Sequence, residues 1–422
     1  MNVWLVKMEE LLPMDKDYRA YRMGMLAEAL VNSGHKVTRW CSDLNPQTKK
    51  YRHGHDYTLV SDHGVTYELL YVKGGDNQSV SLKRYLNNFL IAIKFKKKAL
   101  NLPPPDLIVC AMPTPQLSRI SSEIAKFFKT PLVVDARDYW PDIIEQELKG
   151  IKKYVSMPLI YLMKNDLRKA CIAAYSLVGI TPFYRDHLVN YSGRVKTDKD
   201  SFFPLGYDGK LNQVSYDKVD EYNNFWIKKL KLDLLNTEKK IIYFAGKINL
   251  TVKNGVQPLI SSLEKSGATN SNYIFILCGA GQYLEELQNL LRDVNNVYLP
   301  GHISAEHLAY LRSKSFVAIQ PIENRIDYEN SLSNKFFENI SAGLPILTSL
   351  TGITRKEIES NRCGFYYSSG SELLRLLNKL DSNIELYEEM SKNALELFDT
   401  TYDSKVVYRN FSTYLERIAQ EF

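Results

Sequence analysis

NVWLVKMEELLPMDKDYRAYRMGMLAEALVNSGHKVTRWC, residues 2–41, holds the pattern that decides the fold. The apolar run at 3–6 predicts a strand, and apolar residues at helical spacing over 18–32 predict an amphipathic helix. Gly34 ends this helix, because glycine readily adopts the left-handed conformation that closes a helix. Residues 35–41 then predict a second strand. A strand, a helix and a strand with short joints form a βαβ unit, which implies a parallel sheet.

The same pattern continues along the chain and then starts again. Continuous apolar runs, typical of strands buried on both faces, occur at 107–110, 132–135 and 176–180. After a turn-rich joint near 203–208, strands are predicted at 241–245, 273–278, 297–299, 316–320 and 345–347. The sequence therefore predicts an α/β protein with two Rossmann-like, doubly wound domains, residues 1–205 and 206–401, that face each other across a cleft. The amphipathic stretch 402–422 predicts a C-terminal helix that returns to the first domain.

Composition narrows the class of protein. The 422 residues are 45% hydrophobic and 24% charged, which is ordinary for a globular chain and excludes disorder as the main state. The net charge of +6 favours anionic partners such as nucleotide phosphates. The absence of a long apolar run and of a leader pattern predicts a cytoplasmic protein. Five scattered cysteines predict reduced core thiols, and the sparse histidines predict no metal site.

The richest stretch of the second half is SLSNKFFENISAGLP, residues 331–345. Ser333 and Asn334 lead into a predicted helix, whose free N–H groups suit a diphosphate. Lys335 adds a mobile cation, and Glu338 follows one turn later, where its carboxylate can accept hydrogen bonds from sugar hydroxyls. The alternative is an ordinary capped helix with a solvated polar face.

Other predicted strand ends of the second half carry glycines and basic residues. Glycine lets the backbone approach a ligand closely, and a lysine beside it can neutralise phosphate oxygens. The lysines are Lys247 and Lys253, on the loop after 241–245. The further donor-binding candidates are Gly246, Gly279, Gly281 and His302. The alternative for each is a tight turn or a surface charge without a ligand.

In the first half, VDARDYWPD, residues 134–142, follows a predicted strand. Asp138 or Asp135 could orient an acceptor hydroxyl or take its proton. Arg137 could instead pair with an aspartate in a structural turn. Two arginines after the first strand could face the same region. The acceptor-binding candidates are Arg19, Arg22, Asp135, Arg137 and Trp140.

These stretches together resemble the family-4 glycosyltransferases of the GT-B fold that build bacterial surface polysaccharides. The resemblance rests on Asn334–Glu338 with the following Ala-Gly-Leu-Pro, on Gly279-Ala280-Gly281 and on the Asp135–Pro141 signature. It also rests on the first predicted helix and the strand that follows it. It implies retaining transfer of a sugar from a nucleotide-diphosphate sugar to an acceptor hydroxyl. The donor would bind to the second domain and the acceptor to the first, without a metal ion or a cofactor.

The resemblance also assigns roles to residues. Members of the family carry a pair of glutamates with seven residues between them. The second glutamate, which holds the ribose, matches Glu338. The first matches Asn330, where this chain has an amide in place of the carboxylate. Lys247 and Lys253 match the basic pair that stabilises the departing diphosphate. The implied catalytic residues are Asp138, Lys247, Lys253 and Asn330.

Two other functions stay open on the sequence. A GT-B sugar-nucleotide epimerase would share the two domains but needs an acid–base set that the few histidines do not supply. A non-catalytic glycan-binding subunit is favoured only by Asn330. Nucleic-acid binding has no motif in this chain. The basic amphipathic stretch 85–99 is compatible with an anionic membrane surface and with a lipid-linked glycan acceptor.

Overall fold

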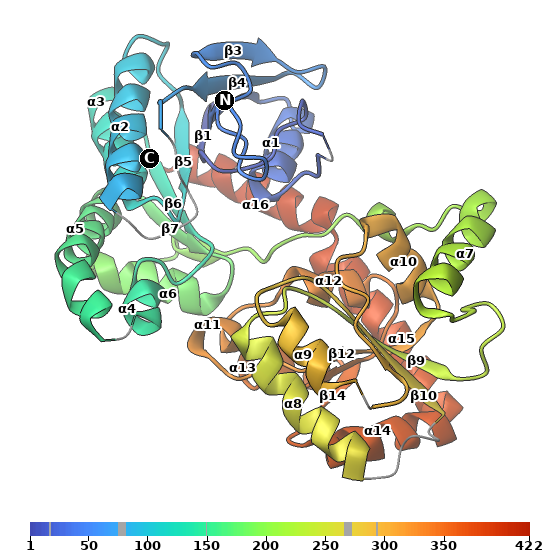
Figure 1. The fold of residues 1–422 in the computed structure, drawn as a ribbon. Coiled ribbons are helices and arrows are strands. Elements are labelled where there is room, and N and C mark those ends of the chain that lie inside the picture. The colour runs from blue at the N-terminus through green and yellow to red at the C-terminus, as the bar shows by residue number, and fades with distance from the viewer. Residues whose placement is uncertain (17, 75–81, 149, 266–271, 293) are drawn as a thin grey trace. The chain divides into compact units, whose positions relative to one another are not determined.

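Two parallel β-sheets organise the chain, which is described by a computed structural model over residues 1–16, 18–74, 82–148, 150–265, 272–292 and 294–422 (Figure 1). One unit comprises Met1–Leu205 with Val407–Phe422, and the other comprises Gly206–Val406. Each sheet is covered by helices on both faces, so the predicted class of two Rossmann-like domains is confirmed. The facing arrangement across a cleft stays a prediction.

The first unit has an eight-stranded sheet in the order β3-β4-β2-β1-β5-β6-β7-β8, parallel except for the hairpin of β3 and β4. The strands are β1 (Asn2–Val6), β2 (Lys36–Ser42), β3 (Tyr57–Val60), β4 (Val65–Leu70), β5 (Leu107–Ala111), β6 (Leu132–Ala136), β7 (Ser176–Gly179) and β8 (Ser201–Phe202). The strand order reverses between β1 and β5. In open parallel sheets a ligand site forms at the carboxyl ends beside such a switch point.

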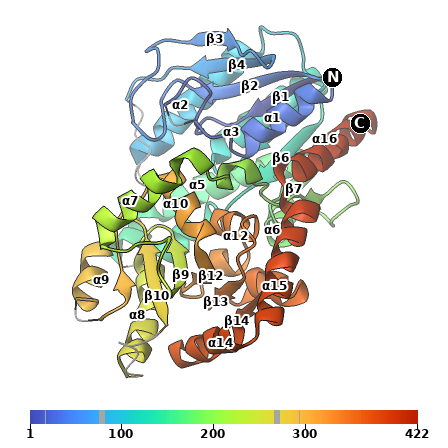
Figure 2. The same ribbon diagram turned by 90° about the vertical axis from the view of Figure 1, so that its right-hand side faces the viewer.

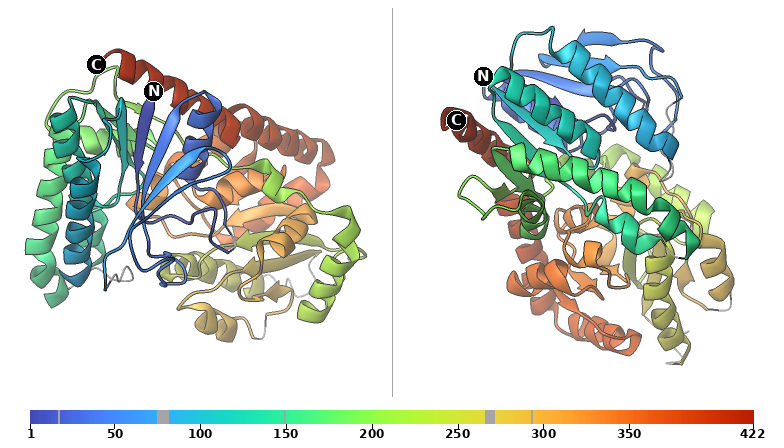
Figure 3. Two further views of the ribbon diagram at one scale, coloured as in Figure 1. Left: turned by 90° about the horizontal axis from the view of Figure 1, so that it is seen from above. Right: turned by 90° about the vertical axis from the view of Figure 1, so that its left-hand side faces the viewer.

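Alternating residues of β1 build the two cores of this unit. Trp4 and Val6 pack under α2 (Leu82–Ala99), α3 (Pro115–Phe128), α5 (Ile151–Ala173) and α6 (Pro182–Ser192). The right-hand view of Figure 3 looks onto α2, α3 and α5, which lie side by side. Val3 and Leu5 pack on the other face under α1 (Arg22–Asn32) and α16 (Ser404–Gln420).

The C-terminal helix belongs to the core of the first unit. Its apolar stripe, which includes Tyr408, Phe411 and Leu415, is buried with α1, and the two helices lie beside each other in Figure 2. The predicted return of this helix to the first domain is confirmed. The periodicity predicts that the first helix begins at residue 18. In the structure this helix begins at Arg22, and residues 18–21 are coil.

The second unit has a six-stranded parallel sheet in the order β11-β10-β9-β12-β13-β14, with its switch point between β9 and β12. Its strands are β9 (Lys240–Ala245), β10 (Tyr273–Cys278), β11 (Val297–Tyr298), β12 (Ser315–Gln320), β13 (Ile346–Thr348) and β14 (Gly364–Tyr366). Ile242 and Phe244 pack with α8 (Leu250–Lys265) and α14 (Gly370–Ser382). Tyr243 points the opposite way, toward α10 (Ala305–Ser313) and α12 (Asn334–Ile340).

The remaining helices complete the two units. They are α4 (Asp142–Glu147), α7 (Val219–Leu230), α9 (Leu284–Leu290), α11 (Ile326–Glu329), α13 (Gly352–Ser360) and α15 (Ile384–Leu397). All five cysteines are buried and free, as the sequence predicts. Among the residues described, none of the helices has the length and apolar character needed to cross a bilayer.

Candidate functional site

Three loops of the second unit pack against one another at the carboxyl ends of β9, β10 and β11. Gly246 N donates to Cys278 O at 3.0 Å, and Gly279 N donates to Gly301 O at 2.8 Å. A Cβ on Gly279 would lie 1.9 Å from Gly246 O, and one on Gly281 would lie 2.1 Å from Ile248 O. These glycines are therefore required by the contact between the loops themselves, whether or not a ligand is bound.

The two lysines that the sequence pairs at this edge have different surroundings. Lys247 is exposed on the loop after β9, beside the switch point of the sheet. Lys253, in α8, forms an ion pair with Glu286 and lies over the ring of Tyr283, 5.3 Å from its centroid. Lys247 thus offers its ammonium to a ligand directly, whereas Lys253 must first leave its carboxylate. His302 is exposed on the loop after β11.

The short helix α12 starts as the sequence predicts. The Ser333 hydroxyl accepts a hydrogen bond from Phe336 N at 3.3 Å and caps the helix, and Asn334 is exposed. Lys335 Nζ lies 2.7 Å from Glu338 Oε2, one turn further along. Lys335 and Glu338, which the sequence predicts to contact a nucleotide sugar, therefore form an ion pair with each other.

A third charged residue, Arg312 of α10, completes this cluster and was not predicted. Its Nη2 donates to Glu338 Oε2 at 2.9 Å and to the Tyr243 hydroxyl at 3.2 Å, and its other nitrogen donates to Asn212. Arg312 and Glu338 are each only 3% exposed. A single arginine on an amphipathic helix gives no sign in the sequence of a partner 26 residues away. The cluster fixes the direction of the Glu338 carboxylate.

Asn330 occupies the position where the resemblance expects a carboxylate. Its Nδ2 donates to Ile326 O at 2.8 Å, which closes the turn of α11. The neighbouring Glu329 accepts a hydrogen bond from the Thr351 hydroxyl at 2.5 Å. Both side chains support local structure here, and the catalytic role of Asn330 stays a prediction.

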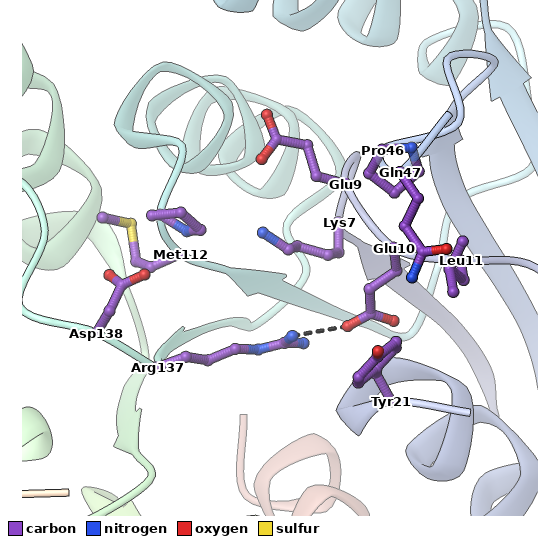
Figure 4. A pocket seen from close by; sticks show the side chains of 11 residues that line it. Lys7, Glu9, Glu10, Leu11, Tyr21, Pro46, Gln47, Met112, Arg137 and Asp138 are labelled. Atoms are coloured by element: carbon purple, nitrogen blue, oxygen red, sulfur yellow. Dashed lines mark hydrogen bonds and ion pairs between the residues drawn. The ribbon is translucent and has the colours of Figure 1, made fainter. Parts of the chain in front are cut away.

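In the first unit, a cavity of about 400 Å³ opens at the switch point between β1 and β5 (Figure 4). Its polar lining comes from the loops after β1 and β6, which supply Lys7, Glu9, Glu10, Arg137 and Asp138. Its apolar and remaining lining comes from Leu11, Tyr21, Pro46, Gln47, Met112 and Pro113. A cavity with both apolar faces and convergent polar groups is the usual form of a small-ligand site.

Ion pairs hold one wall of this cavity rigid. Arg137 Nη1 donates to Glu10 Oε1 at 2.7 Å, and Arg39 Nη2 donates to Glu10 Oε2 at 2.7 Å (Figure 4 shows the first pair). Burial alone would raise the pKa of Glu10, but Arg137 and Arg39 outweigh it and hold that pKa below its usual value. Glu10 is therefore an anion that fixes Arg137 in place.

Lys7 and Asp138 are the cavity groups with the most unusual ionisation. Lys7 is 6% exposed, and its Nζ makes no hydrogen bond or ion pair with any residue that the structure describes. Burial lowers the pKa of Lys7 and raises the pKa of Asp138, while the opposite charges of the two groups partly offset both effects. Asp138 Oδ1 accepts a hydrogen bond from Trp140 N at 3.2 Å. A buried donor and a half-buried acceptor with perturbed pKa values in one cavity mark a candidate site.

The other acceptor-binding candidates lie outside the cavity. Arg22 and Asp135 form a two-pronged ion pair, at 2.8 and 2.9 Å, and both are sealed from solvent. Arg22 also donates to the carbonyls of Phe203 and Pro204, which ties α1 to the end of the sheet. The polar atoms of this pair are satisfied within the protein and present nothing to an acceptor in this structure.

Arg19 and Trp140 are half-buried, and their acceptor-binding role stays a prediction. Trp140 packs between the core and Arg84, whose guanidinium carbon lies 5.3 Å from the centre of its ring. Of the five candidates, the structure brings only Arg137 to the cavity, next to Asp138.

Asp142, at the start of α4, anchors the segment that follows the cavity. It accepts a hydrogen bond from the Tyr191 hydroxyl at 2.7 Å and pairs with Lys164 at 2.9 Å and His187 at 3.3 Å. Burial alone would raise its pKa, but the nearby His187 and the polar contacts with Lys164 and Tyr191 lower it to about 2. Asp142 is therefore ionised over the whole range in which the protein would work.

Sequence reasoning missed Lys7, Glu10 and Arg312. The signal for the first two was present, because both follow the first predicted strand at its carboxyl end, where ligands gather in a parallel sheet. No comparable signal exists for Arg312. Within the described ranges, no group of three or more His, Cys, Asp or Glu side chains is arranged to hold a metal ion.

Comparisons with known proteins give a family match within the second unit. Residues 228–397 match the model of the family described as glycosyl transferases group 1. This range includes the three glycine loops, both lysines, Arg312 and all of α12. No curated protein sequence matches the chain.

Solved structures match the chain over its full length. Sucrose-phosphate synthase from Thermosynechococcus elongatus is 13% identical, with a TM-score of 0.71 and all of both chains covered. HepE from Anabaena, in complex with UDP, is 13% identical with a TM-score of 0.64, covering 99% of this chain and 100% of its own. WaaG, a glycosyltransferase involved in lipopolysaccharide biosynthesis, is 14% identical with a TM-score of 0.61, covering 98% and 99%. The chain has the GT-B fold. Together with the family match, this supports a glycosyltransferase of the GT-B superfamily.

Proposed function

We propose that the protein is a retaining glycosyltransferase that moves a hexose or deoxyhexose from a nucleotide-diphosphate sugar to an acceptor hydroxyl. The observation that carries this proposal is the family match over 228–397, because it spans the loops and the helix that form the candidate site of the second unit. The complexes of HepE with UDP and with UDP-glucose support a nucleotide sugar as the donor.

In this proposal the second unit handles the donor. Breaking the bond between sugar and phosphate leaves a nucleoside diphosphate with growing negative charge. The exposed ammonium of Lys247 would stabilise this charge directly, and Lys335 and Lys253 would add to it by turning from Glu338 and Glu286 toward the phosphates. Such fixed and mobile cations make a metal ion or a cofactor unnecessary in the proposed reaction.

The first unit would hold the acceptor in the cavity beside β1 and β5. Lys7 would donate to one acceptor oxygen, and Asp138 would accept from a hydroxyl beside the one that reacts, which orients the acceptor. Attack on the same face of the donor sugar from which the phosphate departs retains the configuration at the anomeric carbon. The departing phosphate oxygen takes the hydroxyl proton, so the products are the glycoside and the protonated nucleoside diphosphate.

The setting we propose is the assembly of a bacterial surface polysaccharide, such as lipopolysaccharide, O-antigen or capsule, on the cytoplasmic side of the membrane. The likeness to WaaG supports this setting. The acceptor would then be a glycan or a lipid-linked glycan.

Thermal stabilisation by a panel of nucleoside diphosphates and their sugars tests the donor site, because a ligand that binds the folded state raises its stability by mass action. We expect one base to stand out. Lys247→Ala should weaken its binding about tenfold, the loss of one charge-assisted hydrogen bond. Lys229→Ala, at an exposed position of α7, is the matched control. No stabilisation by any nucleotide, or equal binding by the two variants, would contradict the proposal.

A further inference from the structure

Two stacked rings lie on the surface of the first unit, where the edge strand β3 begins. The centres of the His53 and Tyr57 rings are 4.1 Å apart at an interplanar angle of 15°, and the His55 ring lies edge-on to both at 6.1 Å. His53 is exposed, and Tyr57 is 41% exposed. Neither ring is part of the two cores that pack against β1. We call His53 and Tyr57 the ring pair, which offers a flat apolar surface to a ligand.

Buried polar contacts hold the ring pair in place. Asp43 is sealed from solvent and accepts hydrogen bonds from His53 N at 3.0 Å and Gly54 N at 2.8 Å, and its Oδ1 lies 3.0 Å from His53 Nδ1. Arg52 donates to Asp15 at 2.8 and 2.6 Å, which ties this loop to the loop after β1. The His53 ring is therefore fixed before a ligand arrives, and a preformed surface lowers the entropic cost of binding.

The strand register places the ring pair at the same edge of the sheet as the cavity. Lys7 of the cavity follows Val6 of β1, and Tyr57 precedes Thr58 of β3. Val6 and Thr58 end one row of paired residues, whose middle members are Trp40 and Glu68. Strand β3 runs antiparallel to β4, so it begins beside the carboxyl ends of the parallel strands. Three strand spacings, about 14 Å, separate Lys7 from Tyr57 along this edge (the strand order is visible in Figure 2).

One loop connects the cavity to the ring pair. The loop after β2, residues 43–56, supplies Pro46 and Gln47 to the cavity and His53 to the ring pair. Gln47 is exposed, and its amide can both donate to and accept from hydroxyls. The cavity has a ring of its own, Tyr21, which is 36% exposed (Figure 4). Rings at both ends of the edge and an amide on the connecting loop suit a chain of sugars, because each pyranose has an apolar face and a rim of hydroxyls.

We propose that the ring pair is a subsite for one sugar of an oligosaccharide whose end sugar lies in the cavity. This sugar stacks its apolar face on the ring pair, while Gln47 hydrogen-bonds a sugar nearer the cavity. Linked pyranoses repeat about every 5 Å, given carbon–carbon bonds of about 1.5 Å, so three units span the edge. The two sites together therefore select a glycan of at least three sugars over a monosaccharide. That this glycan is the acceptor rests on the proposed function, whereas its binding does not.

Ligand-observed NMR titration of the full chain with short glycans, in the absence of nucleotide, tests this proposal. The probes are maltotriose, cellotriose, mannotriose and chitotriose, each compared with its monosaccharide. The test variant Tyr57→Thr removes the ring and keeps a residue type suited to a strand. Tyr57→Phe keeps the ring, and Tyr216→Thr, at a position that is 93% exposed in the second unit, is the matched control.

We expect at least one trisaccharide to bind the wild type, Tyr57→Phe and Tyr216→Thr at least about tenfold more tightly than its monosaccharide does, and Tyr57→Thr to lose this advantage. If no trisaccharide binds more tightly than its monosaccharide, or if Tyr57→Thr keeps the full advantage, the proposal is overturned. Self-association of the wild type that Tyr57→Thr abolishes also overturns it, because the rings at this edge strand would then cover a second copy.

Thermal stabilisation by nucleotides is measured on the same proteins, so that the two proposals can fail separately. A protein that shows the expected glycan binding but is stabilised by no nucleotide would support the subsite and contradict the proposed function. A protein that a nucleotide stabilises, but that binds trisaccharides no better than monosaccharides, would contradict the subsite alone.

Discussion

Replacing Arg312 by methionine tests the buried charge cluster of the second unit. Arg312 and Glu338 are almost completely buried, with Nη2 and Oε2 2.9 Å apart, so Arg312→Met leaves a carboxylate in the core without its main counter-ion. Breaking a buried pair in this way costs about 3–5 kcal/mol. Lys335 still reaches the same oxygen at 2.7 Å, so we expect the lower end, about 3 kcal/mol. For a domain of this size the midpoint of thermal unfolding should fall by about 6–12 °C.

Scanning calorimetry of the full chain measures the effect, and a double variant identifies its cause. Arg312→Met with Glu338→Met removes both charges, so the protein should regain at least half of the lost stability. Lys335→Met is the control, because the Lys335 side chain is 35% exposed and its ion pair should contribute less than about 1 kcal/mol. If Arg312→Met unfolds within about 2 °C of wild type, or if the two substitutions add without coupling, the buried pair is not what stabilises this part of the domain.

Three further predictions concern single side chains. The pKa of Asp142 is lowered to about 2 in the folded protein, so its carboxylate gives stability that is present above the unfolded-state pKa and lost as the pH falls through the folded-state pKa. Between pH 4 and pH 2 the free energy of unfolding of Asp142→Asn should therefore fall by about 2 kcal/mol less than that of the wild type. Thermal unfolding of both proteins across this range checks the prediction. Gly255→Ala should destabilise the second unit by about 1–3 kcal/mol in urea unfolding, because its Cβ would lie 2.1 Å from Pro321 O; an unchanged midpoint would show that the backbone yields freely. Lys7→Met should leave the free energy of unfolding unchanged or higher, because it removes a buried cation without a close partner. The same variant should transfer sugar about tenfold more slowly and bind nucleotide as the wild type does. Full activity of the variant would exclude Lys7 from the acceptor site.

The periodicity of the sequence was sufficient for the fold class. Apolar runs such as 107–110 and 132–135 are typical of strands buried on both faces, and their alternation with amphipathic helices indicates parallel sheets. The capping of α12 by Ser333 was likewise local, because the cap and the N–H group that it binds lie three residues apart. Patterns of this kind depend on neighbours in the chain, so the sequence contains all of their determinants.

The candidate site was only partly predictable, because its charges are paired across the fold. Asp135 and Arg22 belong to two separate sequence motifs, yet they form an ion pair with each other in the core. Glu338 was predicted to meet a ligand, and the structure adds Arg312 and Lys335 as its partners. The pairing depends on the distance between elements that the sequence order does not reveal.

The sequence by itself determined where strands and helices form and which ends of the strands would carry polar residues, because these features follow from spacings of two to four residues. Only the tertiary structure decided which face of a helix is buried. Helix α5 is apolar on both sides, so its composition cannot show that Ile160 and Met163 lie in the core while Tyr154 and Val155 face solvent. That choice is made by the surface against which the helix packs, and the same choice determines which charges are paired and which remain available to a partner.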